Sequence, residues 1–310
     1  MSKIHLSARL LGPGLSLALI ACSGSPASSN GSGIHVVATT GMVADAARNV
    51  LGGHGRVEAL MGAGVDPHLY KASESDVRRL ADADLILHNG LHLEGKMGEI
   101  LEKIAESRPV VAVSDVLPRA ELREPPAGLA TQYDPHIWFD VELWSRTLPP
   151  VVAALSKLDP AHAAEFEQNA ETYRQQLLEL DRWVGGRIAE IPAERRVLVT
   201  AHDAFGYFGR RYRIEVLGLQ GISTVTEAGL ADLERVVGVV TQRKVKAVFV
   251  ESSVPRRSIE AVQAACRAKG WEAAIGGQLF SDALGAPSTP EGTYVGMVRA
   301  NVETIVHALK

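Results

Sequence analysis

Residues 159–190 read DPAHAAEFEQNAETYRQQLLELDRWVGGRIAE, and this stretch decides how the rest of the chain is organised. Its large apolar residues recur every three or four positions, the period of one face of an α-helix. Asp159 before Pro160 is typical of a helix start, and Pro192 marks the end. The stretch therefore predicts one long helix of roughly 45 Å. Its apolar positions are Phe166, Ala170, Tyr173, Leu177, Leu180, Val184 and Ile188.

On both sides of this helix, short β-rich runs alternate with segments of helical period. Such alternation predicts βαβ units with parallel strands. We therefore expect an α/β protein with two Rossmann-like lobes, residues 34–158 and 191–310, each built on a parallel four-stranded sheet and joined by the long helix. The expected strands are 34–40, 56–61, 84–88 and 109–113 in the first lobe, and 196–200, 214–217, 247–250 and 273–276 in the second. The clearest expected helices are 42–51, 73–83, 230–243 and 258–269.

The N-terminus has the pattern of a secretion signal. Its basic start is followed by an apolar run too short to span a bilayer, so residues 1–21 are expected to be a signal peptide. Leu-Ile-Ala-Cys at 19–22 resembles the lipobox of bacterial lipoproteins, which predicts lipidation of Cys22 and a flexible Ser/Gly tether over 22–33. An ordinary signal peptide with an incidental cysteine is the alternative. With Cys22 lipidated, Cys266 has no partner for an intramolecular disulfide.

Composition and missing motifs argue against several classes of function. The chain has 310 residues, 46% of them hydrophobic, and a formal net charge of −4. No stretch rich in Lys or Arg forms a basic stripe, which argues against a nucleic-acid partner. The helical His-Glu-x-x-His, phosphate-loop and Gly-x-Ser-x-Gly motifs of common hydrolases and nucleotide enzymes are absent.

A doubled tripeptide is the strongest chemical signal. Asp66-Pro67-His68 and Asp134-Pro135-His136 both fall in expected loops. Proline restricts the backbone around it, so each histidine lies on a stiffened loop, and the aspartate two residues earlier could orient its imidazole. A lone histidine would more often be structural, but two in the same setting suggest metal ligands.

The second lobe supplies candidates in matching positions. His202 lies where a strand ends and a helix is expected to begin, and a helix N-terminus would favour a neutral ring. Asp282 also follows a strand. Ligands of open α/β sheets bind beyond the carboxyl ends of the strands, which places His68, His202 and Asp282 in one crevice within reach of His136. Glu251, at another strand end, is expected behind a ligand rather than on the metal.

Several motifs together resemble one family. They are Val-Ala-Thr-Thr-Gly-Met-Val-Ala-Asp at 37–45, Asp-Pro-His-Leu-Tyr at 66–70, Asn-Gly-Leu-His-Leu-Glu at 89–94, Asp-Pro-His-Ile-Trp-Phe-Asp at 134–140, Thr-Ala-His-Asp-Ala-Phe-Gly-Tyr-Phe at 200–208, Glu-Ser-Ser at 251–253 and Gly-Thr-Tyr-Val at 292–295. The chain resembles the metal-binding lipoproteins of ABC importers, the cluster A-I group that includes TroA, ZnuA and manganese-binding lipoproteins. The resemblance implies two α/β lobes, a long linking helix, and metal ligation by His68, His136, His202 and Asp282.

The resemblance also implies a function and partners. The chain is expected to be an extracytoplasmic, membrane-anchored lipoprotein and a monomer, not an enzyme, that delivers Zn²⁺ or Mn²⁺ to an ABC permease driven by an ATPase. Three imidazoles and one carboxylate favour Zn²⁺ over Mn²⁺ in vitro. A metal-dependent hydrolase and a surface adhesin are the alternatives. Other histidines are expected to be structural or solvated, namely His35, His54, His88, His92, His162 and His307.

Overall fold

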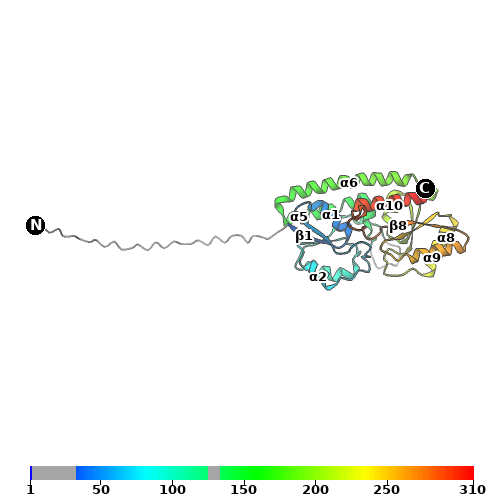
Figure 1. Ribbon diagram of the computed structural model, residues 1–310, viewed down its shortest axis with the longest axis horizontal. Helices are drawn as coiled ribbons and strands as arrows, with labels where there is room; N and C mark the ends of the chain where they lie inside the picture. The colour runs from blue at the N-terminus through cyan, green and yellow to red at the C-terminus, as the bar shows by residue number, and fades with distance from the viewer. Residues whose placement is uncertain (2–32, 125–132) are drawn as a thin grey trace. The chain divides into compact units, whose positions relative to one another are not determined.

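The structure, a computed structural model, describes Met1 and residues 33–124 and 133–310 (Figure 1). The expected signal peptide (1–21), the proposed lipidation site Cys22 and the tether up to residue 32 lie outside the described residues, Met1 apart. Residues 33–310 form one compact unit. No helix in the described ranges combines the length and the apolar character needed to cross a bilayer.

The first lobe is an α/β unit around one parallel sheet. Its strands are β1 (Ile34–Ala38), β2 (Gly55–Ala59), β3 (Leu85–His88) and β4 (Val110–Ala112), in the order β2-β1-β3-β4. The helices are α1 (Gly41–Leu51), α2 (Glu74–Ala81), α3 (Gly98–Ala105), α4 (Val141–Ser145) and α5 (Leu148–Leu158). β1 is buried along its whole length, as a strand flanked by two others should be. The expected strands of this lobe are confirmed with their ends shifted by one or two residues.

The second lobe has the same alternation of strands and helices, but its strands form two parallel pairs and not the single four-stranded sheet that the sequence predicts. Its strands are β5 (Val197–His202), β6 (Glu215–Gln220), β7 (Ala247–Glu251) and β8 (Ala274–Leu279), with helices α7 (Gly206–Tyr212), α8 (Leu230–Gln242), α9 (Arg257–Ala268) and α10 (Tyr294–Leu309). The parallel ladders join β5 to β6 and β7 to β8, while β5 lies against β7 without a continuous ladder. At the carboxyl end of that seam, the main-chain N–H of His202 donates to the Glu251 side chain instead of a strand carbonyl.

The long helix is confirmed as α6 (Ala163–Ala189), preceded by a 3₁₀ turn over Pro160–His162. Its buried residues are the seven that the apolar period predicted. α6 packs on α1, α4 and α5 of the first lobe and on α7 and α10 of the second. Figure 1 shows α6 running past α5 at one end and α10 at the other. One apolar cluster joins β1, α6, β7 and α10, so the two lobes share a core. This shared core restricts their relative motion more than the linking helix alone would.

Candidate metal centre

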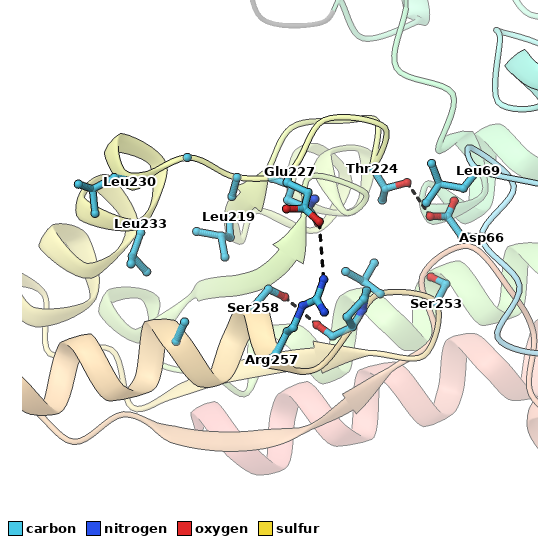
Figure 2. A pocket seen from close by; sticks show the side chains of 16 residues that line it. Asp66, Leu69, Leu219, Thr224, Glu227, Leu230, Leu233, Ser253, Arg257 and Ser258 are labelled. Atoms are coloured by element: carbon cyan, nitrogen blue, oxygen red, sulfur yellow. Dashed lines mark hydrogen bonds and ion pairs between the residues drawn. The ribbon is translucent and has the colours of Figure 1, made fainter.

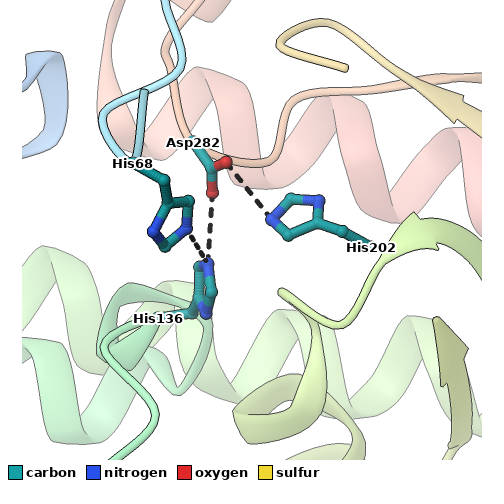
Figure 3. A group of neighbouring side chains, drawn as sticks. All are labelled: His68, His136, His202 and Asp282. Atoms are coloured by element: carbon teal, nitrogen blue, oxygen red, sulfur yellow. Dashed lines mark hydrogen bonds and ion pairs between the residues drawn. The ribbon is translucent and has the colours of Figure 1, made fainter. Parts of the chain in front are cut away.

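Four side chains from both lobes converge on one point. His68 lies on the loop after β2, His136 directly precedes a 3₁₀ turn (Ile137–Phe139), His202 ends β5 and Asp282 follows β8. Each offers one ligand atom, and these atoms all lie within 4.8 Å of one another (Figure 3). The carboxyl ends of three parallel strands therefore position three of the four groups, as the sequence predicts.

The contacts within this cluster are close but poorly satisfied. His68 Nε2 lies 3.3 Å from His136 Nε2, which is 3.4 Å from Asp282 Oδ1. His202 Nε2 lies 3.2 Å from Asp282 Oδ2. These residues are 5%, 0%, 0% and 1% exposed, in chain order. Yet His202 Nε2 and both Asp282 oxygens find no aligned hydrogen-bond partner among the described residues. Leaving such atoms buried and unpaired is costly, and a cation among them would satisfy all three.

Two carboxylates behind the cluster orient two of its rings. Asp134 Oδ1 accepts from His136 Nδ1 at 2.8 Å, and Glu251 Oε2 accepts from His202 Nδ1 at 2.5 Å. Each carboxylate also accepts from the main-chain N–H of the same histidine, at 3.0 and 2.9 Å. Because Nδ1 is engaged behind, Nε2 of each ring faces the cluster. This carboxylate–histidine arrangement is the one that fixes the ring of metal-ligating histidines.

Asp66 does not act in the same way, which corrects the expectation for it. Its Oδ1 accepts from the main-chain N–H of His68 at 2.8 Å, not from the imidazole. Its Oδ2 accepts from the Thr224 hydroxyl at 2.6 Å. Thr224 belongs to the other lobe and lies 158 residues further along the chain, so the local tripeptide could not reveal this contact. Asp66 therefore holds the His68 loop and joins the lobes, and among the described residues no carboxylate is hydrogen-bonded to the His68 ring.

The pKa values of the three histidines shift in different directions. Burial disfavours the charged ring of His136, but Asp134 and Asp282 outweigh this effect and raise its pKa to about 9. Burial acts the same way on His202, where Glu251 and Asp282 raise the pKa well above the usual range. At His68, burial dominates and lowers the pKa to about 3. Despite the burial of Asp282, the rings of His202 and His136 hold its pKa well below the usual range.

This result overturns one argument made from the sequence. We expected a helix N-terminus to keep His202 neutral. α7 begins only at Gly206, four residues after His202, and the Glu251 carboxylate bonds directly to the ring. A hydrogen-bonded carboxylate in a buried site outweighs a helix terminus at that separation, since the influence of the terminus fades within one turn.

Further residues hold the His136 loop, and sequence reasoning did not assign them roles. Trp138 donates from Nε1 to the carbonyl of Ser281 at 3.0 Å, which joins this loop to the residue before Asp282. Asn89 donates from Nδ2 to the Pro135 carbonyl at 3.0 Å, and Arg123 pairs with Asp134. Two of these residues, Asn89 and Trp138, lie inside the motifs at 89–94 and 134–140. Their place in these motifs is the sequence signal that could have identified them.

A separate cavity of about 730 Å³ is lined by residues of both lobes (Figure 2). Asp66 and Leu69 line it from the first lobe, while Thr224, Leu230 and Arg257 are among the residues that line it from the second. None of the four converging residues lines it. The hydrogen bond from Thr224 to Asp66 lies at the wall that the two lobes share.

Comparison with known proteins agrees with this architecture. The family profile described as ZnuA, zinc-uptake complex component A, periplasmic, matches residues 36–308. The chain belongs to the ZnuA family. A relative in the ZnuA group, the zinc-binding protein TroA of Treponema pallidum, is 52% identical over 277 residues, 88% of each chain. The manganese-binding lipoprotein MntA of Bacillus subtilis is 50% identical over 277 residues, 89% of this chain and 90% of that one.

A solved structure shows the same ZnuA-family fold. The periplasmic zinc-binding protein TroA from Treponema pallidum matches with a TM-score of 0.87 and 51% identity, covering 90% of this chain and 99% of that one. The described chain therefore has the fold of a two-lobed substrate-binding protein over nearly its whole length, which confirms the fold predicted from the sequence.

Proposed function

We propose that this protein captures a divalent transition metal outside the cytoplasm and delivers it to an ABC permease. The ion would be held by His68, His136, His202 and Asp282. One observation carries the proposal: two oriented Nε2 atoms and an unpaired carboxylate converge, with a third imidazole, in a site that is almost fully buried. The names of relatives, which are binding proteins for zinc and manganese, support it.

The donor set favours Zn²⁺ over Mn²⁺ as the tighter ligand. Three imidazole nitrogens and one carboxylate oxygen can form a tetrahedral N₃O site, the geometry of protein-bound zinc. Manganese prefers more oxygen ligands and ranks below zinc for a given nitrogen and oxygen site. A bidentate Asp282 would move the site partway toward manganese. Which of the two ions is carried in the cell is a separate question, and relatives of similar identity bear both names.

The geometry favours capture over catalysis. A catalytic zinc ion typically has three protein ligands and an open position for water. Here four potential protein ligands converge, enough to fill a tetrahedral site, and their side chains are almost fully buried. A surface adhesin would not require such a cluster at all. Hydrolysis of ester or peptide substrates by the metal-loaded protein would favour the hydrolase instead.

The anchor and the partners form a second part of the proposal. Lipidation of Cys22 would hold a monomeric protein at the membrane near the permease and its ATPase, and the lipobox pattern supports this. Replacing Cys22 with Ser should give a soluble protein with unchanged metal affinity, because the tether separates the anchor from the lobes. A Cys22→Ser protein that stays in the membrane fraction after signal cleavage would contradict lipidation at this residue.

Metal analysis of protein purified without chelator, followed by competition titration, tests the function. We expect one tightly bound ion per chain and zinc binding tighter than manganese. His136→Ala, His202→Ala and Asp282→Ala should each weaken the tight site by orders of magnitude and remove most metal-induced thermal stabilisation. His307→Ala is the matched control, since His307 is exposed on α10. Parent-like binding by His136→Ala would remove that residue from the site.

A further inference from the structure

A second group of metal-ligating side chains lies away from the buried cluster. His54 is in the turn between α1 and β2, His162 ends the 3₁₀ turn before α6, and Glu165 is in the first turn of α6. One ligand atom from each lies within 4.8 Å of the others. In Figure 1 this start of α6 lies by α5 and β1, at the opposite end of α6 from the C-terminus. The sequence predicts structural or solvated roles for His54 and His162 and gives no sign that the two residues lie together.

The two rings are held close together. Their centroids lie 4.0 Å apart with 33° between the planes, and the Phe166 ring packs against His54 in a T-shaped arrangement. His54 Nε2 lies 2.8 Å from Glu165 Oε2. A residue from a turn of the first lobe thus meets two from the start of the linking helix, a separation of more than 100 residues that no local pattern predicts.

The ring of His162 is oriented by the same device as in the buried cluster. Its Nδ1 lies 2.6 Å from Asp159 Oδ2, and the neutral ring donates there, so Nε2 carries the lone pair. A carboxylate on one ring nitrogen fixes the other toward a metal. His54 Nε2, His162 Nε2 and a Glu165 oxygen would supply an N₂O donor set, the same protein ligands as in open His₂Glu zinc sites.

We propose that His54, His162 and Glu165 form a second, weaker site for a late first-row divalent metal, with Zn²⁺ as the probe. The side chains are partly exposed, at 23% for His54, 40% for His162 and 59% for Glu165, so water completes the coordination. The donor atoms need to close to about 3.3 Å, the spacing of two ligands about 2.0 Å from a tetrahedral ion. The ion replaces the proton that His54 and Glu165 share, and it ties the α1–β2 turn to α6.

The site differs from the buried one in two testable ways. With three protein ligands and an exposed carboxylate it should bind zinc much more weakly than the buried cluster does. Manganese, which ranks lowest among these metals at nitrogen-rich sites, should not fill it at concentrations that fill the buried cluster. The inference uses only the geometry of this outer group, so it stands or falls separately from the proposed transport function.

Calorimetric titration of the folded protein with Zn²⁺ alone tests the proposal. We expect two steps in the parent, one tight and one weak. His54→Ala and His162→Ala should lose the weak step and keep the tight one, while His136→Ala should keep the weak step. His307→Ala is the control with an equivalent ring removed from an exposed helix position, and it should keep both steps.

A conservative variant guards against a folding artefact. Asp159→Asn leaves all three ligands in place but weakens the hold on His162, so the weak step should lose about tenfold in affinity. A parent that shows a single step up to millimolar zinc would overturn the proposal. So would a weak step that persists in both His54→Ala and His162→Ala.

Discussion

The His68 loop and the loops that carry His136 and His202 form one metal centre but are built differently. His136 and His202 each have a carboxylate hydrogen-bonded to Nδ1, which fixes the ring and raises its pKa. His68 has its backbone held by Asp66, and its pKa is lowered to about 3. Two ligands are thus oriented in advance and hold protons, whereas the third is neutral and depends on a contact between the lobes. We therefore expect the carboxylates behind His136 and His202 to set the metal affinity, and the contact between Asp66 and Thr224 to set the rate of metal release.

Protonation gives the largest expected effect. At neutral pH the raised pKa values of His136 and His202 keep both rings protonated in the metal-free protein, and a metal ion must displace the Nε2 proton of each. His68 contributes no proton at neutral pH. Metal affinity should therefore rise with pH by up to about 100-fold per unit between pH 5 and 8, because each displaced proton gives a tenfold change per unit.

Calorimetry in buffers of different ionisation enthalpy measures this directly. We expect close to two protons released per zinc ion at pH 7.5. Two free imidazoles with the ordinary pKa of about 6.5 would be mostly neutral at that pH and would release few. A result near zero would mean that the carboxylates behind the rings do not hold protons on them.

The carboxylates give the next largest effect. Glu251→Gln and Asp134→Asn should each lower zinc affinity by about 10- to 100-fold, because the amide no longer fixes the Nδ1 proton of the ring. Both variants should also release fewer protons on binding. Asp66→Asn is the matched control, since Asp66 bonds to the main chain of His68 and not to its ring. An equal loss of zinc affinity in all three variants would contradict the proposed difference between the His68 loop and the loops that carry His136 and His202.

The contact between lobes gives the smallest effect. Thr224→Val removes the 2.6 Å hydrogen bond to Asp66, and the metal dissociation rate should rise a few-fold, at most about tenfold. Stopped-flow transfer of zinc to a chelator measures the rate. Thr172→Val makes the same chemical change at a hydroxyl that bonds within α6 and should leave the rate unchanged. Equal rates in the Thr224 variant and the parent would show that this contact does not control release.

Much of this centre was accessible from the sequence, for physical reasons. The seven apolar positions of α6 follow from helical period, and strand ends in parallel sheets meet at one edge, which placed His68, His202 and Asp282 together. The role of Asp134 in orienting the His136 ring could be predicted because Pro135 restricts the backbone between these two residues. Each of these features depends on residues close in the chain or on a general rule of sheet topology.

What could not be predicted depends on partners remote in sequence. Asp66 and Asp134 have the same local motif, yet Thr224 draws the Asp66 carboxylate to the other lobe. His54 and His162 lie far apart in sequence and meet only through packing of α6 on the first lobe. The core shared by both lobes also arises from α10 returning to pack on α6 and α1. A local sequence pattern cannot predict such long-range contacts.

Anomalous diffraction at the zinc edge, from crystals grown with one equivalent of zinc, tests the central claim most directly. The account predicts one strong peak within about 2.3 Å of Nε2 of His68, His136 and His202 and of an Asp282 oxygen. His202→Ala crystals prepared in the same way should lose that peak. A parent crystal with zinc at His54 and His162 but no peak among the four buried residues would contradict it.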